Sequence, residues 1–249
     1  MTQTASTQSN AFAPLSQRFA ALDGAALRAE FQANEEFIAI PGFMSAEEMA
    51  PLLDALPQLE PRVHRNFIPG HKKGGSISRY DLDGHAPAFP DFYRSAGLQD
   101  FLQALCGRPL LQCPADDPHT YALYYYTEAG DHIGWHYDTS YYKGARYTVL
   151  LGLVDESSCR LEYELHRNDD KRATVAGGTA LSPGMLVVFN GDKLWHRVTP
   201  SGPGERRVVL TLEYVTTLGM HPLRRFVSNM KDAIAYFGFR QVFSGAKRH

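Results

Sequence analysis

The stretch that decides the fold is His-Ile-Gly-Trp-His-Tyr-Asp at residues 132–138, which contains an H-x-D motif at His136 and Asp138. Residues two apart on a β-strand point to the same face, so both side chains can bind one ion. His196 follows much later, far enough along the chain to lie on a separate strand that returns beside the first. Two imidazoles and one carboxylate can hold one face of an octahedral metal and leave the opposite face open. The sequence therefore predicts a metal site at these three residues.

Two arginines, Arg206 and Arg207, follow the third histidine after a Ser-Gly-Pro-Gly turn. The residues after the turn are rich in valine and leucine, which predicts a strand. Period-two alternation divides this strand into an apolar face, Arg206, Val208, Leu210, Leu212 and Tyr214, and a more polar face, Arg207, Val209, Thr211 and Glu213. A polar face suits a ligand cavity, so we prefer Arg207 as the group that grips a carboxylate through two parallel hydrogen bonds. Arg206 remains the alternative.

The spacing of these residues resembles that of the Fe(II)/2-oxoglutarate-dependent dioxygenases, whose pattern is H-x-D/E, a distal histidine and a basic residue soon after it. The matching positions are His136, Asp138, His196 and Arg207, and the resemblance spans roughly residues 35–217. It implies a mainly β fold with flanking helices, namely a distorted double-stranded β-helix (jelly roll, cupin-like). It also implies an oxygenase that uses Fe(II), 2-oxoglutarate and O2 and releases succinate and CO2.

Residues 122–144 resemble more closely the branch that contains the free-amino-acid radical halogenases and their hydroxylase relatives. Halogenases of that branch replace the ligand carboxylate with glycine or alanine, whereas this chain keeps Asp138. We therefore expect hydroxylation of an unactivated C–H bond in a free amino acid or amino-acid-like small molecule. Desaturation, cyclisation or hydroxylation of another natural-product intermediate is the alternative within enzymes. A metal-binding β-barrel that senses a ligand is the alternative outside them.

Several further residues are candidates for binding the two organic molecules. Tyr124 and Tyr126 share one strand face, and a hydroxyl there would help Arg207 to hold 2-oxoglutarate; aromatic core packing is the alternative. The candidates for the substrate are Arg79, His119, Thr139, Thr211 and Glu213. Arg79, expected on a strand near Ile77–Leu82, would bind a carboxylate, and Glu213 would bind an ammonium or guanidinium group. A structural ion pair is the other reading of Glu213.

Composition narrows the class of protein. The 249 residues carry 25 Lys and Arg against 27 Asp and Glu, a formal net charge of −2, which does not indicate a nucleic-acid binder. The basic residues between Arg62 and Lys73 are interpreted as a solvated loop. Three cysteines lack metal-ligand spacing and predict reduced thiols. The first thirty residues lack a secretory signal pattern, and no apolar run is long enough to cross a bilayer, so we expect a cytoplasmic protein.

The order of elements predicts a disordered N-terminus at residues 1–13 and one domain at residues 14–249, with the jelly-roll core at about 109–217. Helical patterns lie at Leu15–Phe31, from Ser45 to about Leu56, at Phe89–Leu105 and at Leu223–Phe237. Short strands broken by turn residues lie between Phe37 and Ile40 and repeatedly between Pro109 and Val215. The glycine-containing segment from His64 to Asp81 is expected to be a mobile loop that enters a strand.

Overall fold

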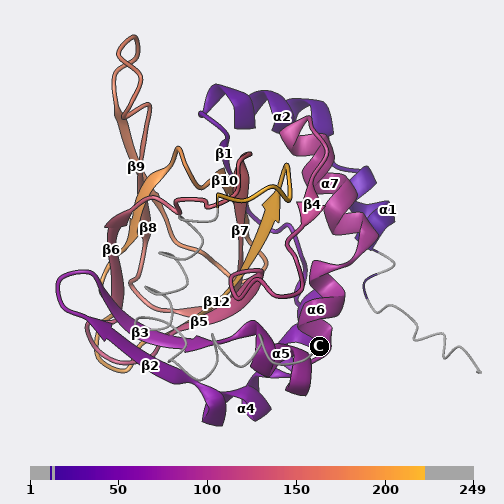
Figure 1. Ribbon diagram of the computed structural model, residues 1–249. Helices are drawn as coiled ribbons and strands as arrows, with labels where there is room; N and C mark the ends of the chain where they lie inside the picture. The colour runs from indigo at the N-terminus through magenta and orange to yellow at the C-terminus, as the bar shows by residue number, and fades with distance from the viewer. Residues whose placement is uncertain (1–11, 13–14, 222–249) are drawn as a thin grey trace, which may run out of the picture.

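The computed structural model of the chain describes residue 12 and residues 15–221 (Figure 1). Its helices are α1 (Leu15–Ala20), α2 (Gly24–Ala33), α3 (Ala46–Leu53), α4 (Leu56–Leu59), α5 (Arg79–His85), α6 (Ala88–Tyr93) and α7 (Ala96–Cys106), with a 3-10 helix η1 (Glu60–Arg62). Its strands are β1 (Phe37–Ile40), β2 (His64–Ile68), β3 (Lys72–Ile77), β4 (Leu111–Gln112), β5 (Tyr121–Tyr126), β6 (His132–His136), β7 (Arg146–Glu156), β8 (Leu161–Leu165), β9 (Val175–Thr179), β10 (Leu186–Asn190), β11 (Trp195–Val198) and β12 (Arg206–Val215). The N-terminal segment expected to be disordered, apart from Phe12, and the helix expected at Leu223–Phe237 lie outside the described residues.

The described strands form one antiparallel sheet in the order β1-β10-β7-β12-β5-β3-β6-β11-β8-β9, with β2 paired to β3 and β4 paired to β12. Side chains from strands far apart in this order meet in one interior cluster, which shows that the sheet curls on itself. Phe37 of β1, Leu161 of β8 and Val209 of β12 all belong to it. Figure 1 shows the curled sheet beside a layer of helices that includes α1, α2, α6 and α7. The expected jelly-roll fold is confirmed.

The two faces of β12 contact different hydrophobic clusters. One face packs in the core between the sheet and the helices, and the other faces the interior of the curled sheet. Leu210, Leu212 and Tyr214 are fully buried in the large core that the sheet shares with the helices. Val209, on the opposite face, packs in the interior cluster. The period-two assignment made from the sequence is therefore correct, and it places Arg207, Thr211 and Glu213 on the interior side.

The helices follow the sequence pattern with local breaks. Ser45 opens α3 as the expected capping box, because its side chain accepts from the Glu48 backbone N–H and the Glu48 carboxylate accepts from the Ser45 N–H. The pattern expected as one helix at Leu15–Phe31 is two helices, the second capped by Asp23. The pattern at Phe89–Leu105 is likewise divided between α6 and α7. Among the described residues, no helix is both long and apolar enough to span a membrane.

The segment from His64 to Asp81 is not the expected mobile loop. It forms the hairpin of β2 and β3, turned at Gly70, whose positive φ of 72° favours glycine. Gly75 lies inside β3, where a Cβ would come within 2.5 Å of Val63, so this glycine allows close packing in a strand. The strand expected near Ile77–Leu82 is also wrong: Ser78 accepts from the Asp81 N–H, and this side-chain cap begins helix α5.

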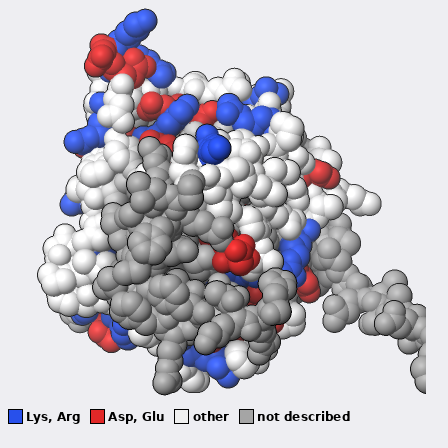
Figure 2. Space-filling view, viewed as in Figure 1, with Lys and Arg blue, Asp and Glu red and all other residues white. Residues whose placement is uncertain are grey.

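The surface and the cysteines agree with the composition. On the face in Figure 2, Lys and Arg side chains are interspersed with Asp and Glu, and both signs meet at the tip of the β8–β9 hairpin. Cys106, Cys113 and Cys159 are free and buried, as expected for reduced thiols.

A buried carboxylate fixes the turn that leads into β6. Asp131 accepts from both terminal nitrogens of Arg65, at 2.9 and 2.6 Å, and from the backbone N–H groups of Thr127 and Glu128. Burial opposes ionisation of Asp131, but these hydrogen bonds outweigh burial and lower its pKa. The start of the strand that carries His136 is therefore tied to the β2–β3 hairpin.

Asp131→Asn tests this tie. The amide offers one acceptor oxygen and turns an NH2 group toward Arg65 or the backbone donors, so we expect a loss of about 1–3 kcal/mol in the free energy of unfolding near neutral pH. A folded-state pKa below the unfolded value near 4 gives a contribution that is lost as pH falls through the folded pKa. Urea unfolding should therefore show a smaller difference at acid pH, with Asp100→Asn on the exposed side of α7 as the control. Equal stability of variant and wild type at neutral pH would contradict the proposed tie.

Candidate metal centre

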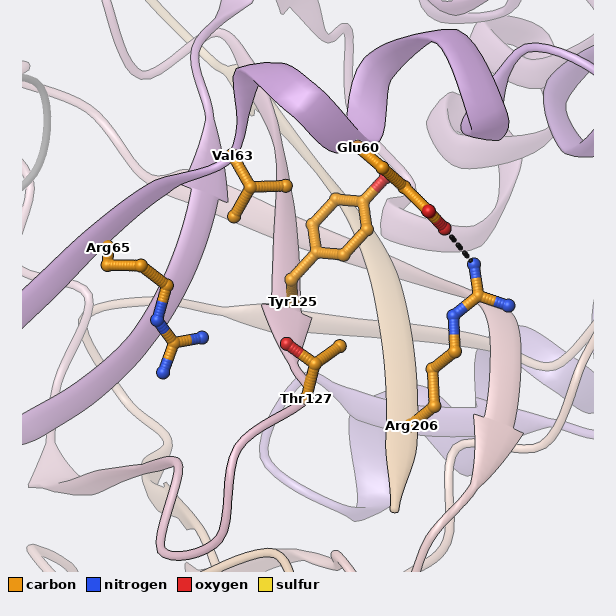
Figure 3. A pocket seen from close by; sticks show the side chains of 6 residues that line it. All are labelled: Glu60, Val63, Arg65, Tyr125, Thr127 and Arg206. Carbon is orange, nitrogen blue, oxygen red and sulfur yellow. Dashed lines mark hydrogen bonds and ion pairs between the residues drawn. The ribbon is translucent and has the colours of Figure 1, made fainter. Parts of the chain in front are cut away.

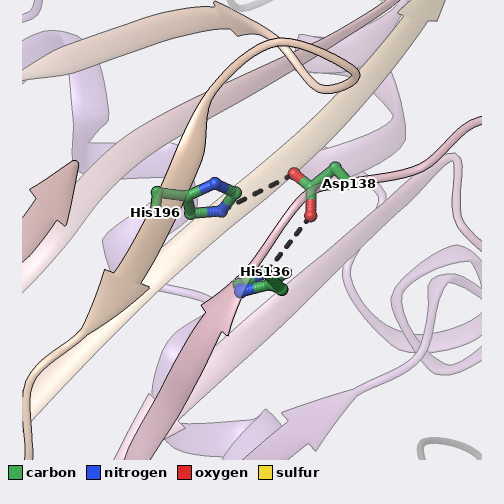
Figure 4. Close-up of side chains that lie close together, drawn as sticks. All are labelled: His136, Asp138 and His196. Carbon is green, nitrogen blue, oxygen red and sulfur yellow. Dashed lines mark ion pairs between the residues drawn. The ribbon is translucent and has the colours of Figure 1, made fainter. Parts of the chain in front are cut away.

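Three side chains meet at the point where β6 pairs with β11. His136 and His196 are directly opposite each other in the antiparallel register, and Asp138 lies just past the end of β6 (Figure 4). The candidate ligand atoms lie within 4.8 Å of one another. Asp138 Oδ1 is 3.3 Å from His136 Nε2, and its Oδ2 is 3.9 Å from His196 Nε2. The structure therefore brings together the three residues singled out from the sequence.

Both imidazoles are oriented by their own strands. The Nδ1 atom of His136 is 2.8 Å from the carbonyl oxygen of Gly134, and that of His196 is 3.0 Å from the carbonyl oxygen of Leu194. A carbonyl oxygen only accepts, so each Nδ1 carries a hydrogen, and in the neutral imidazole each Nε2 then has a lone pair free for a metal. Those two Nε2 atoms are the ones that face Asp138.

The electrostatics of the site fit a cation. Burial opposes ionisation of Asp138, but His196 and His136 outweigh it and hold its pKa well below the usual range. Burial lowers the pKa of His196 to about 4, so this imidazole is neutral at neutral pH. Burial also opposes protonation of His136, although the hydrogen bond and charge of Asp138 raise its pKa overall. Two imidazole nitrogens and one carboxylate are the donor set that suits Fe(II) with open coordination positions.

Arg207 lies on the interior face, and some of its N–H donors are not used in hydrogen bonds within the described part of the chain. It is 1% exposed, and its Nε and Nη1 atoms have no hydrogen-bond partner among the described residues. Its guanidinium carbon lies 4.9 Å from the centre of the Tyr126 ring, the residue opposite it on β5. A buried cation with unmet donors is costly, and an anionic ligand would remove that cost. Arg207 could therefore hold a carboxylate at this position.

Arg206 points to the other side of the sheet. Its Nη2 atom donates to Glu60 at 2.6 Å, and its side chain is about a third exposed. It lines a shallow pocket of about 320 Å³ on the outer side, together with Glu60, Val63, Arg65, Tyr125 and Thr127 (Figure 3). This position leaves Arg207 as the arginine of the pair that faces the interior.

Lys72 is an interior residue that the sequence did not single out. It is 1% exposed, so the solvated loop expected for its neighbourhood is wrong at this position. Its Nζ atom lies 4.5 Å from the centre of the Tyr124 ring, and its charge opposes protonation of His136. The alternation Lys72, Gly74, Ser76 in β3, with Ser76 opposite Tyr124, is the signal that reveals its interior position once the hairpin is known.

The expectation for Arg79 is wrong in its local structure. Arg79 lies on α5, not on a strand, and is buried. Its Nη2 donates to Asp83 at 2.8 Å, and its Nη1 lies 3.3 Å from the Thr120 hydroxyl. These contacts tie α5 to the start of β5. Arg79 comes directly after Ser78, the residue that caps α5. The sequence pattern had placed both residues in a strand.

Glu213 is buried in the interior, and its charge is matched within the protein. Arg146 Nε donates to Glu213 Oε2 at 2.8 Å, which is the structural ion pair considered from the sequence. Thr148 Oγ1 lies 3.2 Å from both Glu213 oxygens and 2.8 Å from Asp138 Oδ2. Burial raises the pKa of Glu213 to about 7, against the opposing charge of Arg146. Sequence reasoning missed Arg146 and Thr148, because neither belongs to a recognisable motif.

The remaining substrate candidates are spread around the same region. Thr211 is half-buried on the Glu213 face of β12, and Thr139 is exposed beside the ligand Asp138. His119 is half-buried, its backbone N–H donates to Asp117, and its ring centre lies 6.4 Å from that of Tyr141. The roles of these three side chains stay predictions.

Comparison with protein families gives one match. The Halogenase D family model matches residues 24–144, a stretch that contains His136 and Asp138 and about half of the chain. No curated protein sequence matches closely enough to count as a relative.

Solved structures with this fold are numerous. The epimerase SnoN from nogalamycin biosynthesis, described as non-haem and α-ketoglutarate-dependent, is 15% identical with a TM-score of 0.63, over 77% of this chain and 80% of its own. A prolyl-4-hydroxylase from Pseudomonas putida is 15% identical with a TM-score of 0.57, over 79% and 100%. An oxidoreductase of the 2OG-Fe(II) oxygenase family from Burkholderia pseudomallei is 15% identical with a TM-score of 0.62, over 81% and 95%.

These proteins share the curled antiparallel sheet but few residues, so they establish the fold. The triad of His136, Asp138 and His196 adds the ligand pattern that the sequence resemblance implied. The chain therefore has the fold of solved 2-oxoglutarate-dependent oxygenases, and it carries the three candidate metal ligands that the sequence resemblance implied.

Proposed function

We propose that the protein is an Fe(II)/2-oxoglutarate-dependent hydroxylase of a free amino acid or an amino-acid-like small molecule. The observation that carries the proposal is that one curled sheet contains both a candidate cation site and a candidate carboxylate site. Three donor atoms within 4.8 Å suit a divalent cation, and a buried arginine with unpartnered nitrogens suits a carboxylate. A SnoN structure is described as a complex with Fe3+ and α-ketoglutarate, which supports the same pair of ligands for this fold.

In this reaction the protein holds and orients its reactants. His136, Asp138 and His196 would hold iron through two Nε2 atoms and one carboxylate oxygen, and Arg207 would hold the far carboxylate of 2-oxoglutarate. When bound, iron with 2-oxoglutarate and O2 supplies the oxidising power that yields succinate and CO2 and breaks a substrate C–H bond. Leu150, Val209 and Phe189 form part of an apolar cluster in the interior, and the Phe189 ring packs edge-on against His196.

Asp138 supports hydroxylation over halogenation. The Halogenase D match includes position 138, where halogenases of the related branch have glycine or alanine. In this chain the carboxylate is present, ionised and in contact distance of both imidazoles. A carboxylate ligand occupies the position that a chloride would need.

Charged side chains near the triad support a polar, amino-acid-like substrate. Arg146, Glu213 and Lys72 are buried on or beside the interior face, and Thr211 and Thr139 lie nearby. Arg146 and Glu213 compensate each other and Lys72 adds a positive charge, so the interior beside the triad is polar enough to suit a zwitterion. The neighbours that share the fold include a carbocyclase, SnoK, and the epimerase SnoN, so cyclisation or desaturation of another natural-product intermediate is the second candidate.

An assay with a panel of amino acids separates these possibilities. We expect the protein with Fe(II), ascorbate and O2 to convert 2-oxoglutarate to succinate, and a substrate to gain 16 mass units. A product that loses two mass units would instead favour desaturation or ring closure. Saturable metal and 2-oxoglutarate binding without succinate formation would favour a ligand sensor.

Asp138→Ala tests the metal site. Removing the only anionic ligand should weaken Fe(II) or Co(II) binding by about 100-fold or more, since the imidazoles alone leave the ion's charge uncompensated. Metal titration monitored by tryptophan fluorescence is the measurement, because Trp135 and Trp195 each adjoin a ligand histidine. Asp100→Ala, an exposed carboxylate on α7, is the matched control and should bind as the wild type does. Undiminished metal binding by Asp138→Ala would exclude its role as a ligand.

Arg207→Ala tests the co-substrate site, with Arg206→Ala as its neighbour control. Loss of two charge-assisted hydrogen bonds should raise the 2-oxoglutarate concentration for half-maximal succinate formation by about 10- to 100-fold. Arg206→Ala should change it less than about threefold, because Arg206 contacts Glu60 on the outer side. The reverse ranking of the two variants would reject Arg207 as the anchor.

A further inference from the structure

We propose that Thr148 is a positioning residue that decides which oxygen of Asp138 is offered to the metal. The proposal rests on the proposed function, because it assumes that Asp138 is a metal ligand. It concerns a residue on β7, a strand that carries none of the three ligands. Its evidence is a chain of buried polar contacts that begins at Asp138 and ends at Arg146.

The hydroxyl of Thr148 lies between two carboxylates. Its Oγ1 atom is 2.8 Å from Asp138 Oδ2 and 3.2 Å from each oxygen of Glu213. Thr148 is 1% exposed and Glu213 is 3% exposed, so the hydroxyl itself is shielded from bulk water. The two residues are directly opposite each other on β7 and β12, so the backbone register fixes their approach.

A hydroxyl has one hydrogen, and the distances indicate where it goes. The Asp138 oxygen is the nearer acceptor, and Asp138 keeps its charge, which strengthens the hydrogen bond. Glu213 has another donor, because Arg146 Nε lies 2.8 Å from its Oε2. Because the Arg146 guanidinium donates to Glu213, the Thr148 hydroxyl is free to donate to Asp138.

This hydrogen bond breaks the equivalence of the two Asp138 oxygens. Oδ2 accepts from the Thr148 hydroxyl, whereas Oδ1 faces the imidazole of the other candidate ligand, 3.3 Å from His136 Nε2. A carboxylate held in this way presents one oxygen to an ion, and a freely turning carboxylate can present both. Single-oxygen ligation keeps an extra coordination position open for 2-oxoglutarate or O2.

Contacts that do not involve Thr148 hold the backbone of Asp138. Thr148 therefore acts on the side-chain torsion of Asp138. Gly191 packs against Asp138 so closely that an added Cβ would lie 2.8 Å from the Asp138 Cβ and carbonyl oxygen. The Ser140 N–H also donates to Asp192 Oδ1 at 3.1 Å. The loop after β6 is therefore anchored to the β10–β11 turn whether or not Thr148 is present.

Thr148→Val removes the hydroxyl and keeps the shape of the side chain. We expect Co(II) affinity to fall by about 10- to 100-fold, the usual effect of losing a hydrogen bond to a metal ligand. We also expect the visible absorption spectrum of bound Co(II) to change, because ligation by both oxygens alters the coordination number. Thr148→Ser should restore the wild-type affinity and spectrum. Thr179→Val, on β9, is the matched control and should change neither.

Thermal unfolding of the metal-free variants separates folding from positioning, and Thr148→Ala replaces Thr148→Val if valine prevents folding. Wild-type affinity and spectrum in a folded variant without the hydroxyl would overturn the role of Thr148 and leave the proposed function intact. Absence of saturable Co(II) binding by the wild type would instead reject the metal site itself.

Discussion

The direct antiparallel pairing of β6 with β11 is the constraint on which the site depends. It places His136 opposite His196, although sixty residues separate them in the chain. A slip of one residue would turn one imidazole to the outer side of the sheet. The register is supported from that outer side as well, because Trp135 and Trp195, each adjacent to a ligand, stack with ring centres 6.1 Å apart and planes 7° from parallel. The metal site is thus a product of strand pairing.

The same alternation on β12 gives two neighbouring arginines different environments. Leu210, Leu212 and Tyr214 are locked into the core beneath the helices, so the residues between them must face the interior. Arg207 is then buried beside Tyr126, whereas Arg206 reaches Glu60 on the outer side. The hydrophobic core therefore selects which arginine can meet an anion in the interior.

Much of this arrangement could be predicted because it follows from local rules. The H-x-D spacing and the faces of β12 follow from strand periodicity, the capping box at Ser45 follows from a local motif, and His196 was identified by the family pattern. Lys72 was misplaced because the glycines near it indicated a loop, whereas Gly75 is required by close packing against Val63. Arg79 was misplaced because Ser78, which caps α5, was assigned to a strand. The pairing of Arg146 with Glu213, and the contact of Thr148 with Asp138, depend on which strands become neighbours in the curled sheet, so residue types and spacing could not reveal them.

The distribution of charge in the interior explains why a metal and a dianion are expected to bind together. The half-buried carboxylate of Asp138 is ionised and lies beside the Arg146–Glu213 ion pair, so the triad carries a negative charge that a cation can neutralise. Further along β12, Arg207 has donors without partners among the described residues. A divalent cation satisfies the first region, and a carboxylate satisfies the second. A molecule with a metal-chelating keto acid at one end and a carboxylate at the other would satisfy both, and 2-oxoglutarate has this form.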